Sequence, residues 1–287
     1  MTIKIGVPSK GRLRKNVLEV FKKNRYNLIS ERGERDYFAK IKGKKNIKII
    51  YLHAREIIER LSDNSLDFGF SGYDLLKETS INIQKKILVY KKYNFGNAKL
   101  VVAIPNQWID VQTIADLEEV AFEFKDNKKQ RLRVATKYPN LTRDFLFSKG
   151  VTQFKLVNSL GATETYPFTG SSEIITDITS TGETLKANDL RILKDGIILE
   201  SQACLLISKK SKKKAARSGL LNSFIWISLH SPTYYANTRL FKKFIAKFIA
   251  ESSETESKQK DDFIEDFIEK TVQLESNSKD DFIEEWG

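Results

Sequence analysis

Residues that could bind a phosphorylated ligand gather between positions 173 and 190, in the stretch EIITDITSTGETLKANDL. Residues 173–178 are rich in β-branched side chains and predict a strand that carries two carboxylates. A hydroxyl-rich turn follows and leads into a helix; its members are Thr179, Ser180, Thr181, Gly182, Glu183 and Thr184. Glycine permits a tight turn, and free N–H groups at a helix start attract anions. The stretch therefore predicts a phosphate-binding turn.

The two carboxylates of this stretch, Glu173 and Asp177, narrow the kind of ligand. Carboxylates repel a phosphate unless a divalent cation or ribose hydroxyls lie between them. The pattern therefore suggests a phosphorylated sugar that carries Mg²⁺, with both acids near the ribose or the metal. Taken alone, the same shape also fits a strand, a polar turn and a capped helix with no ligand.

Two earlier strand–loop–helix units have the same general layout. Residues 3–7 predict an apolar strand, and the loop after it carries Lys10, Gly11 and Arg12. Ligands of open α/β sheets bind at such carboxyl ends of strands. Residues 67–70 predict another strand, which leads through Gly72 to Asp74 at a helix start. This second unit faintly repeats the acid–strand–Ser–Gly–helix order of residues 173–190, although a tight turn with an early-helix acid explains it equally well.

The remaining pattern predicts an α/β protein. Apolar runs predict strands at residues 47–52, 87–93, 99–104, 132–135 and 154–157, and a single last strand of the core within 195–208. Residues 113–118 predict a short helix, and residues 124–130 (FKDNKKQ) predict a solvated loop. A chain of 287 residues can bury a large core and suggests two lobes.

Charge is unevenly distributed along the chain. The formal net charge is +12, from 49 Lys and Arg against 37 Asp and Glu. Residues 251–287 hold 13 acidic and 4 basic side chains, so the rest of the chain is strongly basic. A positive field suits a substrate with several phosphates, and no basic motif with interleaved aromatic residues is present to indicate nucleic-acid binding.

Few side chains could build a metal centre or a disulfide. The single cysteine, Cys204, lies in an apolar run and is predicted to be a buried structural thiol. His53 and His230 are far apart in sequence, which disfavours a zinc site. The amino terminus enters a strand directly, and no stretch approaches the length of a membrane span, so we expect a cytoplasmic location.

The last part of the chain has a different composition. Residues 209–217 (KKSKKKAAR) predict a basic linker or helix start, and residues 241–249 have the period of an amphipathic helix. Residues 251–287 contain a repeat, KDDFIEDF at 260 and KDDFIEEW at 279. They predict either a partly disordered acidic tail or two short helices that dock on a partner or on the basic core.

Six stretches of the chain resemble, in order, those of the ATP phosphoribosyltransferase family, which catalyses the first step of histidine biosynthesis. They are residues 8–13 (PSKGRL), 67–76 (DFGFSGYDLL), 133–145 (RVATKYPNLTRDF), 159–164 (SLGATE), 173–190 and 201–208 (SQACLLIS). The resemblance implies that ATP joins phosphoribosyl pyrophosphate through N1 of the adenine, releasing pyrophosphate.

The resemblance also implies roles for individual residues. Residues 180–184 would hold phosphoribosyl pyrophosphate with Glu173 and Asp177, which would face the ribose or Mg²⁺. ATP or the shared cleft would involve Lys10, Arg35, Arg55, Gly72, Asp74 and Glu164. Arg35 is preferred to Arg32 because it stands two residues before Tyr37, as in the family's Arg-x-Tyr pattern. No general base is implied.

The same resemblance predicts the architecture and the partners. The expected fold is a two-lobed α/β core of the type II periplasmic-binding-protein kind. Its first lobe would comprise residues 1–94 and 185–208 and its second lobe residues 95–184, followed by a helical segment at 209–250 and the tail at 251–287. The tail lacks the strand pattern of a histidine-binding domain. This implies a short-type catalytic subunit, homo-oligomeric and paired with a regulatory subunit that resembles histidyl-tRNA synthetase, with no nucleic acid or membrane partner.

Two other classes of protein fit part of the sequence. A solute-binding protein without catalysis would share the fold, but we expect it to carry a secretion signal. A nucleic-acid-binding protein would explain the charge of +12 but leaves the ordered motifs unexplained.

Overall fold

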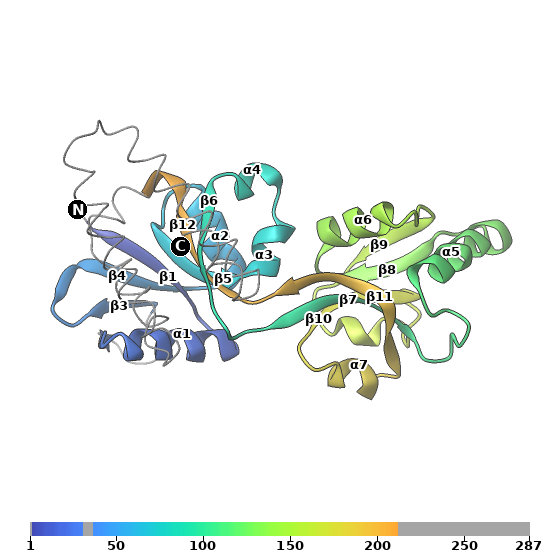
Figure 1. Cartoon of the computed structure of the whole chain (residues 1–287), viewed down its shortest axis with the longest axis horizontal. Helices are drawn as coiled ribbons and strands as arrows, with labels where there is room; N and C mark the ends of the chain where they lie inside the picture. Colours follow the sequence, from blue (N-terminus) through green and yellow to red (C-terminus); the bar gives the residue numbers. More distant parts are fainter. Residues whose placement is uncertain (1, 31–36, 212–287) are drawn as a thin grey trace, which may run out of the picture. The chain divides into compact units, whose positions relative to one another are not determined.

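The computed structural model describes residues 2–30 and 37–211. The predictions for Arg32, Arg35, His230 and residues 212–287 therefore lie outside the described residues. The described strands form two sheets, one of seven strands and one of five, and helices pack on both (Figure 1).

The first sheet has the strand order β2-β3-β4-β1-β5-β12-β6. Its strands are β1 (Ile3–Pro8), β2 (Leu28–Ile29), β3 (Phe38–Ile41), β4 (Lys44–Leu52), β5 (Phe68–Gly72), β6 (Ile87–Lys92) and β12 (Ala203–Ser208). Strands β4, β1 and β5 are parallel, whereas β12 is antiparallel to both β5 and β6. The helices that accompany this sheet are α1 (Gly11–Lys23), α2 (Ala54–Ser62), α3 (Tyr73–Glu78) and α4 (Ile81–Gln84).

Helices cover both faces of the first sheet because its central strands are apolar on both sides. The buried side chains Val17, Val20 and Phe21 of α1 are spaced at helical period and join one core cluster. Ile57, Ile58 and Leu61 of α2 join a second cluster. Neighbouring residues of β12 alternate between the two clusters, as expected for a strand that is buried on both faces.

The second sheet has the strand order β11-β7-β10-β8-β9. Its strands are β7 (Ala98–Pro105), β8 (Leu132–Thr136), β9 (Phe154–Asn158), β10 (Ile174–Thr179) and β11 (Leu190–Ser201). Strand β10 is parallel to β8 and antiparallel to β7. The helices of this part are α5 (Ile114–Lys128), α6 (Pro139–Ser148) and α7 (Glu183–Ala187), with short 3₁₀ turns η1 (Thr163–Thr165) here and η2 (Lys209–Ser211) after β12.

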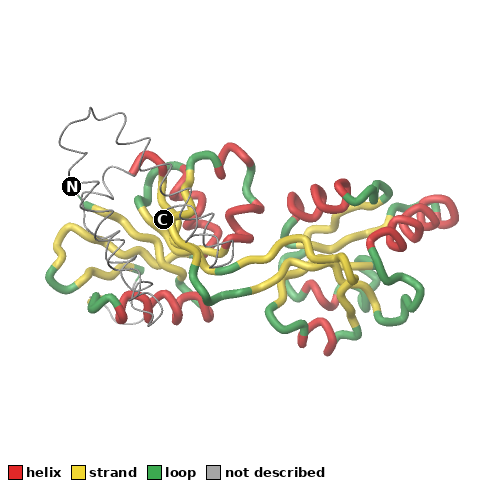
Figure 2. The backbone as a smooth tube through the Cα atoms, in the orientation of Figure 1, coloured by secondary structure: helices red, strands yellow, loops and turns green. Residues whose placement is uncertain are grey.

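The chain passes between the two sheets twice, once from β6 to β7 and once from β11 to β12 (Figures 1 and 2). This arrangement of two sheets, the first of which is completed by strands from both ends of the described chain, confirms the predicted two-lobed α/β core. None of the helices within residues 2–30 and 37–211 is long and apolar enough to cross a membrane.

Strand pairing differs from the sequence prediction at residues 195–208. Residues 195–208 were predicted as one strand of the first lobe, but they belong to two strands in different sheets. Strand β11 pairs with β7 in the second sheet, and only β12 returns to the first. The reason is that the return crossing occurs at Gln202, after β11 has ended at Ser201. The lobe boundaries as a whole stay a prediction.

The predicted loop at residues 124–130 is mostly helical. Helix α5 begins at a capping box of Thr113 and Asp116 and continues to Lys128. The polar residues of FKDNKKQ tolerate a solvated helix face, and Phe124 packs against the core of the second sheet. The Nζ of Lys128 lies 3.7 Å from the centroid of the Phe124 ring. The C-cap residue after the helix, Lys129, has a left-handed φ of 53°.

Candidate functional site

Residues 179–184, here named the hydroxyl turn, connect the carboxyl end of β10 to α7. Gly182 has a φ of +79°, which favours glycine, and its N–H donates to Thr179 Oγ1 at 2.9 Å. Ser180, Thr181 and Thr184 are exposed. The turn is therefore held by one of its own threonines while three other hydroxyl groups remain accessible.

Asp177 is the acidic group on β10 nearest to the hydroxyl turn. Its Oδ1 accepts a hydrogen bond of 2.9 Å from the N–H of Ile178. Burial raises the pKa of Asp177, and the negative charge of Glu164 adds to this effect, whereas the positive charge of Lys137 lowers the pKa. Lys137 directly follows β8, and Glu164 lies in η1. The structure thus brings Asp177, Glu164 and Lys137 into one electrostatic neighbourhood.

The first turn of α1 reaches the hydroxyl turn. Arg12 Nη2 donates to Ser180 Oγ at 3.3 Å, although the two residues are 168 positions apart. Gly11 begins α1 with a φ of +77°, and the Lys10 side chain is exposed and caps no helix N–H group. Two cationic residues, Lys10 just before α1 and Arg12 in its first turn, therefore lie where α1 contacts the hydroxyl turn.

Glu173 is placed differently from Asp177. It lies immediately before β10, four residues upstream of Asp177, which corresponds to about 13 Å along an extended strand. Its Oε2 accepts from the N–H of Arg133 at 2.7 Å, and its Oε1 accepts from Arg133 Nε at 3.1 Å and from Nη2. Both carboxylate oxygens of Glu173 are therefore bound by Arg133, and the structure does not bring Glu173 to the hydroxyl turn.

Gly72, Asp74 and Arg55 lie at a contact between the two sheets. Arg55 Nη2 donates to the carbonyl oxygen of Lys137 at 3.2 Å. Asp74 is buried and accepts from Tyr138 Oη at 2.7 Å and from Ser201 Oγ at 2.6 Å. These residues therefore contact the segment that leads from β8 into α6, and their carboxylate and guanidinium groups already have protein partners.

Sequence reasoning missed Lys137 and Tyr138 and gave little weight to Arg12. Lys137 follows a strand that runs parallel to β10, so its position at a carboxyl end was a usable signal. Arg12 belongs to the matched stretch PSKGRL, but only the structure shows its contact with Ser180. The role of Tyr138 depends on a partner 64 residues away and had no local signal.

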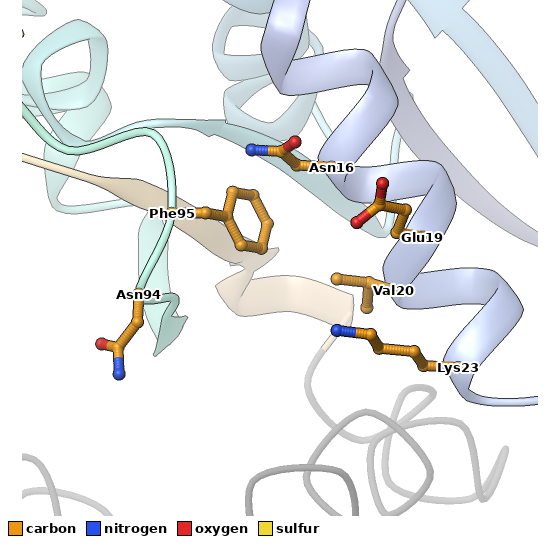
Figure 3. Close-up of a pocket in the computed structure, with 6 residues that line it drawn as sticks. All are labelled: Asn16, Glu19, Val20, Lys23, Asn94 and Phe95. Atoms are coloured by element: carbon orange, nitrogen blue, oxygen red, sulfur yellow. The ribbon is translucent and has the colours of Figure 1, made fainter.

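A surface pocket of about 340 Å³ lies elsewhere, between α1 and the segment after β6. It is lined by Asn16, Glu19, Val20, Lys23, Asn94 and Phe95, and Figure 3 shows the Phe95 ring pointing towards α1. None of the residues predicted to bind substrate lines this pocket. We therefore do not assign the substrate site to it.

Metal-ligating residues are sparse in the described part of the chain. Within residues 2–30 and 37–211, no group of three or more His, Cys, Asp or Glu side chains is arranged to hold a metal ion. His53 Nδ1 accepts from the N–H of Arg55 at the start of α2. Cys204 is buried, as predicted, and burial raises the pKa of its thiol to about 12.

The protein is thus a two-lobed α/β protein with a candidate site for a phosphorylated ligand. The site consists of the accessible hydroxyl turn and the nearby Asp177.

Comparison with known proteins specifies the family. The family model for ATP phosphoribosyltransferase (HisG) matches residues 53–225. An ATP phosphoribosyltransferase of Brucella melitensis is 43% identical over 212 residues, which cover 74% of this chain and 92% of the relative. The ATP phosphoribosyltransferase of a Chelativorans species is 44% identical over 213 residues, which cover 74% of this chain and 93% of that relative.

A solved structure agrees with this assignment at the level of the fold. It is titled as an ATP phosphoribosyl transferase (HisG:HisZ) complex from Thermotoga maritima, with a TM-score of 0.62 and 24% identity. The match covers 80% of this chain and all of that chain. The present chain belongs to the ATP phosphoribosyltransferase family, whose reaction is the first step of histidine biosynthesis.

Proposed function

We propose that the hydroxyl turn binds the 5-phosphate of phosphoribosyl pyrophosphate and that Asp177 faces its ribose hydroxyls or its Mg²⁺ ion. The observation that carries this proposal is the arrangement at the end of β10. Three accessible hydroxyl groups lie next to a carboxylate, and Arg12 and Lys137 supply positive charge to the same place. Hydroxyl donors and cations suit a phosphate group, and a carboxylate suits ribose hydroxyls.

The residues present fit an Mg²⁺ ion that arrives with the substrate. Mg²⁺ keeps several waters and is commonly held by one or two carboxylates together with substrate phosphates. Asp177 and Glu164 influence each other electrostatically and could supply those carboxylates, whereas Glu173 is engaged by Arg133. When bound, the ion would neutralise charge on the pyrophosphate group.

The reaction requires positioning more than a covalent nucleophile. N1 of the adenine forms a bond to C1 of the ribose, while the bond from C1 to the pyrophosphate oxygen breaks and its electron pair leaves with pyrophosphate. Because the attack is in line, the configuration at C1 inverts. In our proposal, Lys10 stabilises the negative charge that develops on pyrophosphate, Arg12 and Lys137 supply positive charge at the hydroxyl turn, and Glu164 lines the substrate site.

We further propose that the chain acts as a homo-oligomeric catalytic subunit that pairs with a regulatory subunit. The support is the Thermotoga maritima structure, whose title names a complex of two components. The regulatory subunit is expected to resemble histidyl-tRNA synthetase, and the cytoplasmic location predicted from the sequence belongs to the same proposal. Copurification of a tagged chain from its own cells, followed by mass determination of the intact complex, tests the pairing.

Initial rates of phosphoribosyl-ATP formation test the site assignment. We expect Thr181→Val to raise the KM for phosphoribosyl pyrophosphate about tenfold, because it removes one hydroxyl donor from a phosphate. Thr152→Val is the matched control, since Thr152 is also exposed but precedes β9. Equal KM values for the two variants would exclude Thr181 from the site, and omission of Mg²⁺ should abolish the reaction in every variant.

A further inference from the structure

Helix α3 carries two acidic residues that are buried although acids usually remain exposed. Asp74 is 7% exposed and Glu78 is 6% exposed. Burial of a carboxylate is costly unless hydrogen bonds compensate for it. Both acids obtain those hydrogen bonds from the second sheet and its helices, so α3 is a contact element between the two sheets.

Asp74 is bound by hydroxyl groups on both sides. Tyr138 Oη donates to Oδ2 at 2.7 Å, and Ser201 Oγ donates to Oδ1 at 2.6 Å. The N–H of Asp74 in turn donates to Ser201 Oγ at 2.9 Å. Tyr138 precedes α6 and Ser201 ends β11, so one carboxylate joins two elements of the second sheet to α3.

The absence of a side chain at Gly72 makes room for this carboxylate. A Cβ atom at Gly72 would lie 2.3 Å from Asp74 Oδ1, which is far inside van der Waals contact. The φ of Gly72 is −77°, so its backbone conformation would suit any residue. Space for Asp74 explains the glycine in SGYD without any ligand.

Glu78 binds the first turn of α6 in the way that a capping residue does. Oε1 accepts from the N–H of Asn140 at 2.9 Å, and Oε2 accepts from the N–H of Leu141 at 3.1 Å. The side chain of Tyr138, which holds the N-cap position, makes no capping hydrogen bond. The cap of α6 is thus supplied by a residue of α3, more than sixty positions away in sequence.

The segment that these acids hold, residues 136–141, is next to the candidate substrate site. Thr136 and Thr176 are register partners on the parallel strands β8 and β10, so Lys137 and Asp177 follow them at neighbouring positions, and the carbonyl oxygen of Lys137 accepts from Arg55. Thr136, at the start of this segment, forms a closed set of buried hydroxyl hydrogen bonds of 2.6 to 3.1 Å with Thr142 and Thr176. Thr176 directly precedes Asp177, so a displacement of this segment would reach both charged groups.

From these contacts we infer that Asp74 and Glu78 are positioning residues, which fix residues 136–141 so that Lys137 stays beside Asp177. They act through Tyr138 and the start of α6 rather than by touching ATP. This inference rests on the proposed substrate site and assigns a different role to Asp74 from the one that the family resemblance suggested. Misplacement of reacting groups by about 1 Å is enough to lower turnover.

The test compares Tyr138→Phe, Asp74→Asn and the double variant in the full-length chain. Tyr93→Phe is the matched control, because the Tyr93 hydroxyl is buried with no hydrogen-bond partner among the described residues. We expect Tyr138→Phe and Asp74→Asn each to lower kcat about tenfold, with the KM for ATP changed less than twofold. The double variant should lose less than the sum of the two single variants, because both changes weaken the contact between Tyr138 and residue 74: phenylalanine lacks the donor, and asparagine offers one acceptor oxygen to two hydroxyl donors. Tyr93→Phe should leave kcat unchanged.

Other results would overturn the inference. If Asp74→Asn raises the KM for ATP and Tyr138→Phe does not, Asp74 binds the nucleotide directly. If Tyr138→Phe behaves like Tyr93→Phe, the hydroxyl has no positioning role. Thermal unfolding separates these effects from loss of structure, and Glu78→Gln provides an independent variant if Asp74→Asn does not fold. If the unaltered chain shows no turnover, alone or with its regulatory partner, the proposed function is contradicted, not the positioning role. The positioning role is then tested by comparing the affinity of each variant for phosphoribosyl pyrophosphate.

Discussion

The two strand–turn–helix units β5–α3 and β10–α7 share an order of acid, strand, Ser, Gly and helix, but their polar groups have different environments. In β5–α3 the acids are buried: Asp67 accepts from the N–H of Lys4 and from Ser211 Oγ, and Asp74 accepts from Tyr138 and Ser201. In β10–α7 the hydroxyl groups of Ser180, Thr181 and Thr184 are exposed. The same pattern thus serves internal hydrogen bonding in one sheet and remains available to a ligand in the other.

This difference shows that a strand–turn–helix pattern predicts local geometry but not its use. The deciding property is whether protein groups already satisfy the polar atoms of the turn. A carboxylate with two short hydrogen bonds from hydroxyl groups has little capacity left for a substrate. The unit β10–α7 is therefore the better candidate for phosphate binding, and each of the following predictions tests that contrast.

The largest effect is expected for Asp177→Asn. We expect kcat/KM to fall on the order of 100-fold. The change removes the negative charge of the Asp177 carboxylate, which in our proposal stabilises the developing oxocarbenium ion or the Mg²⁺ ion. Stability should not fall. Burial raises the pKa of Asp177 in the folded state, so its charge destabilises the fold at neutral pH, and the penalty disappears as the pH drops below the ordinary value of about 4. The asparagine variant should match or exceed the parent chain in Tm at pH 7, as measured by calorimetry; a marked decrease would contradict the raised pKa.

Alanine at the glycines of the two turns should act through different mechanisms. Gly72→Ala should lower the free energy of unfolding by about 1–3 kcal/mol, because the new Cβ displaces the Asp74 carboxylate. Gly182→Ala should cost about 1 kcal/mol, because its φ is +79° but nothing lies within 4 Å of the added atom. Urea unfolding measures both values, and the reverse order would show that strain outweighs the clash.

A smaller effect is expected for Glu173→Gln. The change weakens the ion pair with Arg133, whose side chain is 36% exposed, and should cost about 1 kcal/mol of stability. The KM for phosphoribosyl pyrophosphate should change less than twofold, in contrast to Asp177→Asn. A large rise in KM with unchanged stability would place Glu173 in the substrate site after all.

The smallest expected effect is on the reactivity of Cys204. This residue lies opposite Ser71 in the register of strands β12 and β5. Because burial raises the pKa of the thiol to about 12, we expect no labelling by iodoacetamide at pH 8 in the folded chain and complete labelling in urea. Mass spectrometry of the intact chain measures this. Rapid labelling with no loss of fold would show that the surroundings of the turn between β5 and α3 are open to solvent.

Sequence patterns predicted the local features of both units well. The α/β class, the strands that carry the turns and the buried Cys204 all follow from apolar periodicity and neighbouring turn residues. The amphipathic register of α5 was harder to recognise, because the polar segment after Phe124 fits a solvated helix face as well as a loop.

Distant contacts were the part that sequence could not supply. The partners of Asp74, Glu78 and Ser180 are 62 to 168 residues away, and nothing local indicates them. Glu173 and Asp177 are both carboxylates, one immediately before β10 and one within it, yet the ion pair with Arg133 distinguishes the environment of Glu173. The sheet to which β11 belongs likewise depends on pairing with β7, which the residues of β11 alone do not reveal.

A crystal structure with phosphoribosyl pyrophosphate and Mg²⁺ tests the central contrast most directly. We predict that the 5-phosphate lies within hydrogen-bond distance of Ser180, Thr181 and Thr184, while Asp74 keeps its hydrogen bonds to Tyr138 and Ser201. A phosphate bound at Gly72 and Asp74, with the hydroxyl turn empty, would contradict this account.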